Sequence, residues 1–546
     1  MTASSSAVCP DVSAVLAAVR RWRPELVDPV AAAVPGARAA VLARVWGALA
    51  REPLPQVAGR RVVDDRLVVV LVDGREVVGP VAAAEPFAVS GPAGSAARLR
   101  LLVSDRVVAD PAELVAVVGM DAGARVAGEV ANSVANLALA RGGRAVTAAG
   151  AGAVGGLSRS PVQWEQVVVD GHPLHPGCRT RVGMSTVEVL RYAPEHGPVV
   201  GVELVAVPAH RWVGAGVPVL PVHPWQRDHV LDAYGWLRPS GRVVPARPLL
   251  SLRTVAPIGR PGWQWKTAVD VQMTSAVRTV SAAAVRNGPV VTELLAGLVR
   301  RVAGLRVLRE VSAGAVLVDG VPCRSLAVVR RRVPGVPVGV QVMPVAALAA
   351  PVGVPGGPSV VAGLVRAGYG GDPVAFVAAL ARVVLAPVVA LLGRGVGLEA
   401  HGQNVLLVWR GGRLVGGWYR DVGGVRIDVG RLAASGSSVP VLAGDVGCAD
   451  LWEVAVTAVA AVGSALGEPV AVLAREFGVE PSRLWRPVAQ VARSAVAGLV
   501  PGAREVVGSV LLGGRWPVKA TLVMRLAADP LRVRWAWVAN PLAGVG

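Results

Sequence analysis

The order of apolar and polar positions predicts alternating short strands and helices from the start of the chain. Residues 10–150 mix helical patterns with short Val-rich segments. Residues 64–79, DDRLVVVLVDGREVVG, predict a hairpin closed by an Asp-Gly turn. Asp110 before Pro111 is typical of a helix start, and residues 128–143 predict another helix that ends at glycine. No side chain here indicates chemistry, so we expect a supporting or lid-like part.

The pattern changes in the second half of the chain. Residues 160–345 alternate short strands and hairpins with a few helices. The Pro- and Gly-rich run 333–358 is the predicted boundary. Residues 372–395 are strongly helical up to their proline, and 404–427 predict a hairpin followed by mostly helical patterns. No internal repeat is visible.

Length sets the number of parts. A chain of 546 residues is too long for one core, and about three domains are expected. We predict a mixed α/β (α+β) fold of antiparallel sheets and helices. The expected domains are 1–158, a support; 159–350, an ATP-binding part; and 351–546, which completes the nucleotide, metal and substrate site.

Charge and cysteine content narrow the partners. The formal net charge of +19 favours anionic ligands, but arginines are spread thinly along the chain instead of forming one stripe, so no nucleic acid is expected. The four cysteines are far apart without a CxxC pair, which argues against a disulfide framework or structural zinc.

No membrane partner is expected either. The longest uncharged run, residues 333–365, contains six prolines and cannot form one continuous apolar helix. The first residues lack the basic and apolar regions of a signal peptide. We therefore expect a soluble, cytoplasmic protein, and a homodimer is one candidate assembly.

Lysine is almost absent. Only Lys266 and Lys519 are lysines among the 56 basic residues, so each is a candidate for a site that needs a compact ammonium instead of a planar guanidinium. The alternative is that these two lysines remain in the chain by chance.

The stretch HPLHPGCRTRVG, residues 172–183, predicts a stiff loop because its prolines stand three apart. His172 and His175 could be structural or could bind metal, although the zinc-hydrolase pattern is missing. The loop could also place Arg179 and Arg181 against phosphate or carboxylate groups.

A second candidate lies at residues 247–281. LLSLRTV predicts a strand, IGRPG a turn and WQWKTAVDV a returning strand, which brings Lys266 near Ser251, Arg253 and Thr254. Thr274 or Ser275 is expected to start a helix with Arg278 one turn in. Hydroxyls, a helix N-terminus and three cations suit a polyphosphate; an ordinary basic hairpin is the alternative.

The third candidate is LEAHGQNVLLVWRGGRLVGGWYRDVGG, residues 398–424. The predicted hairpin brings Asn404 and Asp421 to one end, where an amide oxygen and a carboxylate can hold Mg²⁺ with phosphate oxygens. Protein kinases use a similar arrangement, but the catalytic aspartate of kinases is missing here; His401 and Glu399 stand in its place. Glu399 or Asp421 could also be an ordinary solvated carboxylate.

These motifs together resemble the NRPS-independent siderophore synthetases, the aerobactin-synthetase-like family. The resemblance rests on HPLHPGCRTRVG, PVHPWQ, SLRTV, KTAVDVQMTSAVRT, EAHGQN, YRDVGG and VKATLVMRL, in the family's order from about residue 125 onward. The family usually has lysine at position 179 and often an aromatic residue at position 178, and the first 120 or so residues match weakly.

The resemblance implies a cupped-hand fold of thumb, fingers and palm. It implies an enzyme that uses ATP and Mg²⁺ to adenylate a carboxylate, typically of citrate, before an amine or alcohol captures the acyl group. It places a set of residues at ATP or in catalysis: Ser251, Arg253, Thr254, Lys266, Thr274, Arg278, His401, Gln403 and Asn404. It places the metal at Asn404, Asp421 and Glu399. The substrates would meet His172, His175, Arg179, Arg181, Lys519 and Arg525.

The missing base fits adenylation, because a carboxylate with a pKa near 4 is already a nucleophile at neutral pH. Attack then needs positive charge around the phosphates. Two alternatives stay open: a kinase-like phosphotransferase, and a catalytically silent relative that binds a ligand.

Overall fold

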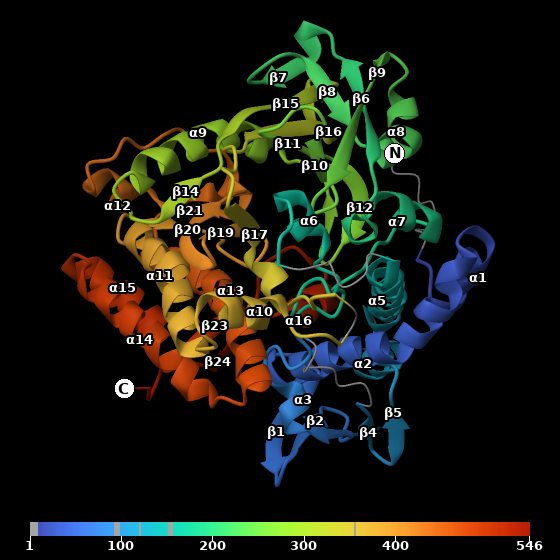
Figure 1. Ribbon diagram of the computed structural model, residues 1–546, viewed down its shortest axis with the longest axis vertical. Helices are drawn as coiled ribbons and strands as arrows, with labels where there is room; N and C mark the ends of the chain where they lie inside the picture. The colour runs from blue at the N-terminus through green and yellow to red at the C-terminus, as the bar shows by residue number, and fades with distance from the viewer. Residues whose placement is uncertain (1–8, 92–98, 120–121, 151–156, 354–355, 546) are drawn as a thin grey trace.

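The computed structural model describes residues 9–91, 99–119, 122–150, 157–353 and 356–545, with backbone only for 148–150. The start of the N-terminal stretch considered for a signal peptide lies outside these residues. Figure 1 shows an N-terminal group of helices beside a small sheet, a large sheet built from the middle of the chain, and a helical C-terminal group. The mixed α+β class with antiparallel sheets is confirmed.

The N-terminal part packs helices against a five-stranded antiparallel sheet of order β1-β2-β3-β4-β5. Its elements are α1 (Val12–Trp22), α2 (Val27–Arg51), β1 (Val57–Val63), β2 (Arg66–Leu71), β3 (Glu76–Pro80), α3 (Val81–Ala84), β4 (Leu101–Val103), β5 (Arg106–Val108), α4 (Pro111–Val118) and α5 (Gly123–Gly150). The predicted hairpin is β2–β3, and Asp110 caps α4 by accepting from Ala112 N and Glu113 N.

The helix predicted over 128–143 is longer than expected. It continues through Gly142 and Gly143 to Gly150. A Cβ on Gly142 would lie 2.7 Å from the backbone nitrogen of Val30 in α2, so this glycine permits close helix packing and does not end the helix.

The middle part is built on an eight-stranded antiparallel sheet of order β7-β15-β16-β11-β10-β9-β6-β8. The strands are β6 (Val200–Ala206), β7 (Trp212–Gly214), β8 (Val219–Val222), β9 (Arg238–Pro248), β10 (Thr254–Pro257), β11 (Trp263–Thr267), β15 (Glu310–Val318) and β16 (Val321–Arg332). Around them lie α6 (Pro161–Gln166), α7 (Thr186–Tyr192), α8 (Pro224–His229) and α9 (Ala282–Val299). A separate ribbon pairs β12 (Val269–Met273) with β13 (Ala276–Arg278).

The C-terminal part surrounds a four-stranded sheet of order β14-β20-β19-β17. Its strands are β14 (Leu305–Val307), β17 (Val340–Pro344), β19 (Val405–Arg410) and β20 (Arg413–Tyr419). A second sheet contains β18 (Val396–Gly397), β21 (Arg426–Asp428) and β22 (Gly447–Cys448). A third sheet pairs β23 (Arg515–Lys519) with β24 (Trp535–Ala539). The helices are α10 (Val360–Gly368), α11 (Pro373–Leu392), α12 (Val429–Ala434), α13 (Leu451–Phe477), α14 (Pro481–Ala497), α15 (Pro501–Leu512) and α16 (Thr521–Leu526).

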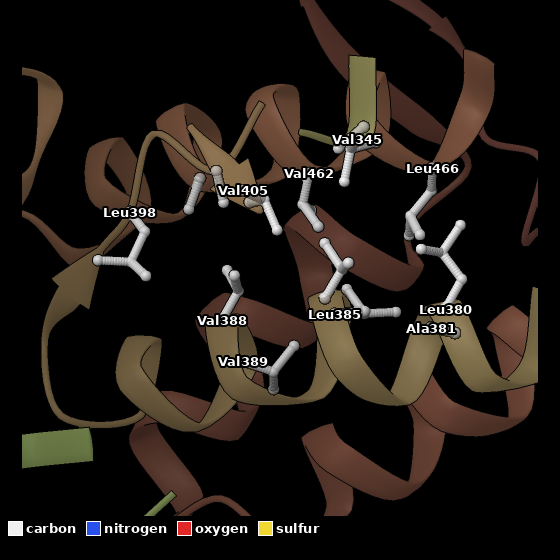
Figure 2. Close-up of a cluster of buried hydrophobic side chains, with 14 of the residues drawn as sticks. Val345, Leu380, Ala381, Leu385, Val388, Val389, Leu398, Val405, Val462 and Leu466 are labelled. Carbon is white, nitrogen blue, oxygen red and sulfur yellow. The ribbon is translucent and has the colours of Figure 1, made fainter. Parts of the chain in front are cut away.

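The largest core of the molecule lies in this part. Figure 2 shows Leu385 and Val388 of α11 facing Val405 of β19 and Val462 of α13. The helix expected to end at its proline runs through Pro387 to Leu392, because apolar side chains on either side of the proline are buried in the same core. Packing outweighs the one backbone hydrogen bond that proline removes.

Within the described residues, three helices are long and apolar enough to cross a membrane by length and composition: residues Pro24–Arg51, Pro373–Leu392 and Leu451–Phe477. Each contributes buried side chains to one of the two largest cores. Residues 333–365 contain a strand and short helices in their described portion, and no single long helix.

The expected domain boundaries remain a prediction. Strands β14 and β17 come from the predicted middle part, yet they pair with β20 and β19 of the C-terminal part. The two parts therefore share a sheet.

Candidate active site

The SLRT motif forms a tight turn between β9 and β10, and not the strand predicted for it. Leu249 N donates to Thr254 O at 2.8 Å, and Leu252 has a positive φ of 64°. The Ser251 hydroxyl donates to Thr254 Oγ1 at 2.9 Å and accepts from Thr254 N. Strand β10 begins only at Thr254, so the Ser251 and Arg253 side chains project from a turn.

Lys266 returns to this turn as predicted. In the register of β10 and β11, Thr254 lies opposite Lys266, and both Thr267 N and Thr267 Oγ1 donate to Arg253 O. The Lys266 ammonium contacts both oxygens of Asp421, at 2.7 and 2.8 Å. Burial lowers the pKa of Lys266, although Asp421 opposes that shift.

The HGQN motif and Asp421 lie at one end of a hairpin, also as predicted. Strands β19 and β20 pair in antiparallel fashion, and Arg420 N donates to Asn404 O at 3.0 Å. Asn404 Nδ2 donates to Glu399 O, while its amide oxygen has no hydrogen-bond partner among the described residues. Asp421 has a positive φ of 68°, an uncommon conformation for a residue other than glycine.

Burial raises the pKa of Asp421, but Lys266 and Arg331 outweigh that effect and hold the pKa below its usual range. The carboxylate is therefore ionised at neutral pH. Its side chain is 30% exposed, against 10% for Lys266, so the carboxylate is the more accessible partner of this ion pair.

The helix expected at Thr274 or Ser275 does not exist. These residues form the turn between β12 and β13, with Thr274 at a positive φ of 56°. Arg278 Nη2 donates to Met273 O at 2.7 Å and to Thr274 Oγ1 at 2.5 Å, which stabilises the turn. The next helix, α9, begins after Ser281, whose side chain accepts from Ala284 N. No helix N-terminus therefore supplies an anion site at Thr274.

The four histidines of the motifs share one local structure. In each, imidazole Nδ1 accepts the backbone N–H two residues later: His172 from Leu174, His175 from Gly177, His223 from Trp225 and His401 from Gln403. The neutral ring then carries its hydrogen on Nε2. Burial lowers the pKa of His175, His223 and His401, and that of His172 falls to about 3, where nearby cationic groups add to the effect. At neutral pH these rings are neutral. Nε2 of His223 is buried without a hydrogen-bond partner among the described residues, and Nε2 of His401 lies 3.4 Å from Asn404 Nδ2.

His175 and His172 point to different partners. His175 Nε2 lies 2.7 Å from Ser275 Oγ and ties the loop to the β12–β13 turn. The protein groups around His172 lower its pKa, yet the residue itself is exposed to solvent, so its Nε2–H is available to a ligand.

Arg179 and Arg181 do not reach a ligand site in this structure, contrary to the sequence-based expectation. Both bind the buried carboxylate of Glu195, at 3.2 and 3.3 Å, and their side chains are 3% and 5% exposed. Arg179 also donates to Val168 O and Val169 O. Glu195 offsets one of the two positive charges, and backbone carbonyl groups accept hydrogen bonds from both guanidinium groups, which favours a role in holding the loop.

Arg525 is likewise enclosed. It donates to both oxygens of Glu129, at 2.9 and 2.5 Å, and to Ser275 O at 3.0 Å. Its position links α5 and α16 to the β12–β13 turn, which favours a structural role over the predicted substrate contact.

Lys519 is accessible. It ends β23 and donates to Glu399 Oε1 at 2.6 Å, with side-chain exposures of 40% for Lys519 and 23% for Glu399. Burial raises the pKa of Glu399, but Lys519 and His401 outweigh it and the pKa is lowered. Both lysines of the protein are thus paired with carboxylates predicted to bind metal.

The charged side chains of this candidate site are mainly positive. Arg253, Lys266, Arg278 and Lys519 face two carboxylates, Glu399 and Asp421. Burial lowers the pKa of Arg278 to about 10, with Arg253 and Arg181 adding to the effect, so it stays charged at neutral pH. Such a site is suited to a polyanion.

The donor set also fits Mg²⁺. The Asn404 amide oxygen has no hydrogen-bond partner among the described residues, and the Asp421 and Glu399 carboxylates can accept a cation if their lysines bind other anions. Among the described residues no group of three His, Cys, Asp or Glu side chains is placed to hold a metal. A metal here would therefore depend on oxygens of the ligand.

Some contacts of the site have no motif in the sequence. Arg44 of α2 is buried and donates to His172 O and Asp170 O, so the N-terminal part holds the His-Pro loop. In the sequence, Arg44 differs from its neighbours only as an arginine in an apolar helical segment, so no motif predicts its contact with the His-Pro loop. A cavity of about 930 Å³ between α9 and residues 435–440 is lined by none of the predicted site residues.

Comparison with known proteins agrees with this geometry. Residues 160–215 and 213–350 match the model "IucA / IucC family", and residues 374–530 match "Ferric iron reductase FhuF-like transporter". Staphyloferrin A synthase of Staphylococcus aureus is 26% identical over 408 residues, which cover 66% of this chain and 69% of that protein. D-ornithine–citrate ligase of the same organism is 24% identical over 171 residues, 24% of this chain and 26% of that protein.

A solved structure shows the same fold. The ATP-bound aerobactin synthetase IucA of Klebsiella pneumoniae superposes with a TM-score of 0.73 at 20% sequence identity, over 92% of this chain and 99% of that one. The match of residues 160–350, the relatives and the ordered motifs support the NRPS-independent siderophore synthetases, of which the IucA/IucC family model is one description. The solved structure supports the same fold.

Proposed function

We propose that this protein is an ATP-dependent siderophore synthetase. It adenylates a carboxylate of citrate or a related polycarboxylate and transfers the acyl group to an amine or alcohol. The relatives named as synthases and ligases of citrate-type compounds support this function, as does the ATP-bound structural neighbour.

One observation carries the proposal. The two lysines of an arginine-rich chain lie at the motif site, and each holds a carboxylate that a metal and an anionic substrate could replace. An ordinary basic hairpin would not place both lysines there. Lys266 is proposed to bind ATP phosphate, and Lys519 a substrate carboxylate.

In the first step, a carboxylate oxygen attacks the α-phosphorus of ATP. The bond between the α-phosphorus and its bridging oxygen breaks, and pyrophosphate leaves with the electron pair. Arg253, Lys266 and Arg278 are proposed to offset the charge on the phosphates. No side chain has to remove a proton, because the attacking carboxylate is ionised at neutral pH.

In the second step, the nitrogen or oxygen of the acceptor attacks the acyl carbon, AMP leaves, and the acceptor loses a proton. His172 Nε2–H is proposed to donate to a substrate oxygen. This contact orients the substrate without requiring a charge on the imidazole.

Asn404, Asp421 and Glu399 would hold Mg²⁺. The ion would supply positive charge to the phosphate oxygens and so add to the effect of the cationic side chains. Lys266 would exchange Asp421 for phosphate, and Lys519 would exchange Glu399 for the substrate carboxylate.

The test is hydroxamate trapping with citrate, 2-oxoglutarate and succinylated amines, together with product analysis. We expect hydroxamate with AMP and pyrophosphate for one of these carboxylates. ADP and phosphate would indicate a kinase-like reaction, and nucleotide binding without turnover would indicate a silent relative.

The match to the FhuF-like description covers residues 374–530, and we propose no second function from it. Cytoplasmic location, absence of a membrane or nucleic-acid partner, and a homodimer remain predictions.

A further inference from the structure

An ion pair of the interior, Glu165 with Arg420, joins parts of the chain 255 residues apart. Arg420 Nη1 donates to Glu165 Oε1 at 2.6 Å, and Nη2 donates to Oε2 at 2.9 Å. The two side chains are only 5% and 4% exposed. Neither is expected to touch a substrate, and neither was singled out in the sequence.

The same two side chains bind the backbone of the nucleotide motifs. Glu165 Oε2 accepts from Leu250 N at 3.2 Å, one residue before Ser251 of the SLRT turn. Arg420 Nη2 and Nε donate to Gln403 O of the HGQN motif, at 2.9 and 3.2 Å.

Arg420 also precedes Asp421 directly, and its backbone N–H donates to Asn404 O. The pair therefore connects the turn that carries Ser251 and Arg253 with both proposed metal ligands on the hairpin. Gln166, the neighbour of Glu165, adds a bond from Nε2 to Pro248 O, so the end of α6 binds two backbone groups on the β9 side of the SLRT turn.

We infer that Glu165 and Arg420 are positioning residues for ATP, which set the SLRT turn at the distance from HGQN and Asp421 that a bound triphosphate requires. This inference rests on the proposed function.

The bidentate geometry explains why a charged pair is used at this position. A guanidinium and a carboxylate in fork-to-fork contact have one preferred relative orientation, and here each has hydrogen-bonding capacity left for a backbone group. Apolar side chains of similar volume could fill the space and even stabilise the fold, but they would not fix the orientation of the two backbone segments. Misplacement of binding groups by about 1 Å can cost about 10²-fold in rate.

The test separates positioning from stability. Glu165→Met/Arg420→Met replaces the pair by apolar side chains and avoids an unpaired buried charge. Arg420→Lys keeps the charge but loses the fork. Glu468→Gln is the control, since Glu468 accepts from Ser90 Oγ at 2.8 Å and, within the described part of the chain, has no hydrogen bond to the SLRT turn or the HGQN motif. Melting temperature, KM for ATP, KM for the carboxylate and the dissociation constant of Mg·ATP by calorimetry are measured for each.

We expect the double variant to melt near the parent, to bind Mg·ATP at least about 10-fold more weakly, and to keep its KM for the carboxylate within about twofold. Arg420→Lys should show the same split, and Glu468→Gln should show none. Unchanged Mg·ATP affinity in the folded double variant, or in Arg420→Lys if the double variant does not fold, would overturn the inference while leaving the proposed function intact. A parent protein that neither binds ATP nor releases pyrophosphate would remove the proposed function, and the positioning role with it.

Discussion

The region around the two lysines and the loop from Asp170 to Arg181 are both rich in charge, but they hold it differently. Lys266 and Lys519 pair with carboxylates that are 30% and 23% exposed. Arg179 and Arg181 pair with Glu195, whose side chain is 1% exposed. Ligands can reach the first pairs, whereas the second are enclosed.

This difference in exposure distinguishes ion pairs that can exchange a partner for a ligand from ion pairs that hold the fold together. A partly exposed pair can give up its partner to a metal or a phosphate, because the incoming ligand replaces the lost charge. A buried pair that loses its partner leaves an uncompensated charge, at a cost of about 3–5 kcal/mol. We therefore expect the arginines next to the His-Pro motif to stabilise the loop, and the two lysines to bind ligands.

The largest effect on activity is expected from Asp421→Asn. The change removes a proposed metal ligand and should reduce pyrophosphate release by about 10²-fold or more, the scale of one preorganised electrostatic group. Steady-state rates at several Mg²⁺ concentrations measure it. Asp372→Asn, at the exposed N-cap of α11, is the control and should keep the parent rate. A folded Asp421→Asn protein with a near-normal rate would rule out the metal role.

The second largest effect on activity is expected from Lys266→Arg. The side chain is 10% exposed and faces the SLRT turn, so a larger guanidinium would displace the phosphate that we expect there. Carboxylate-dependent pyrophosphate release should fall by between about 10- and 100-fold with little change in stability. Arg413→Lys on the remote hairpin turn is the matched control. If both variants keep the parent rate, Lys266 does not bind phosphate or carboxylate.

Arg179→Lys should show the opposite profile. Lysine keeps the charge but cannot reproduce the bonds to Glu195, Val168 and Val169, so the free energy of unfolding should fall by about 2 kcal/mol. At 20 °C the rate of the folded enzyme should stay within about twofold of the parent. A stable Arg179→Lys protein with a large rise in substrate KM would restore the substrate role and blur the difference between the two regions.

The smallest expected effect concerns pH. Burial lowers the pKa of His223 from 6.5 to about 3, so the folded protein keeps this ring neutral while the unfolded chain takes up a proton. Its stabilising contribution is complete above pH 6.5 and is lost as the pH falls from 6.5 toward 3, by about 1.5 kcal/mol between pH 6.5 and 5. Asn can also accept from Trp225 N but does not titrate. The His223→Asn variant should therefore have a lower free energy of unfolding than the parent at pH 7, but should lose less of it on acidification to pH 5. Denaturant unfolding at pH 7 and at pH 5 measures both quantities. A pH dependence equal to that of the parent would contradict the assignment.

Local sequence signals predicted much of the fold and part of the site. Strand alternation and Asp-Gly or Gly-Gly turns predicted the 64–79 and 404–427 hairpins, and these pairings hold. The same logic brought Lys266 to Thr254.

The sequence-based expectations differ from the structure where contacts with residues elsewhere in the fold decide the local conformation, because the local sequence does not reveal such contacts. Thr274 looked like a helix cap, but Arg278 supplies the turn with hydrogen bonds and Ser281 caps the helix. Pro387 and Gly142 looked like helix ends, but core packing carries both helices on. Arg179 and Arg525 bind the buried carboxylates of Glu195 and Glu129, which the motifs do not reveal, and their substrate role stays a prediction.

The most direct test of the proposed chemistry follows one oxygen atom. The protein is incubated with ATP, Mg²⁺, hydroxylamine and the carboxylate that it turns over, labelled with ¹⁸O in its carboxyl groups, and the nucleotide and phosphate products are analysed by mass spectrometry. Attack on the α-phosphorus followed by acyl transfer predicts one ¹⁸O atom in AMP and none in pyrophosphate. Label in inorganic phosphate with formation of ADP would show attack on the γ-phosphorus and contradict the assignment of Lys266, Arg253 and Asp421 to adenylation.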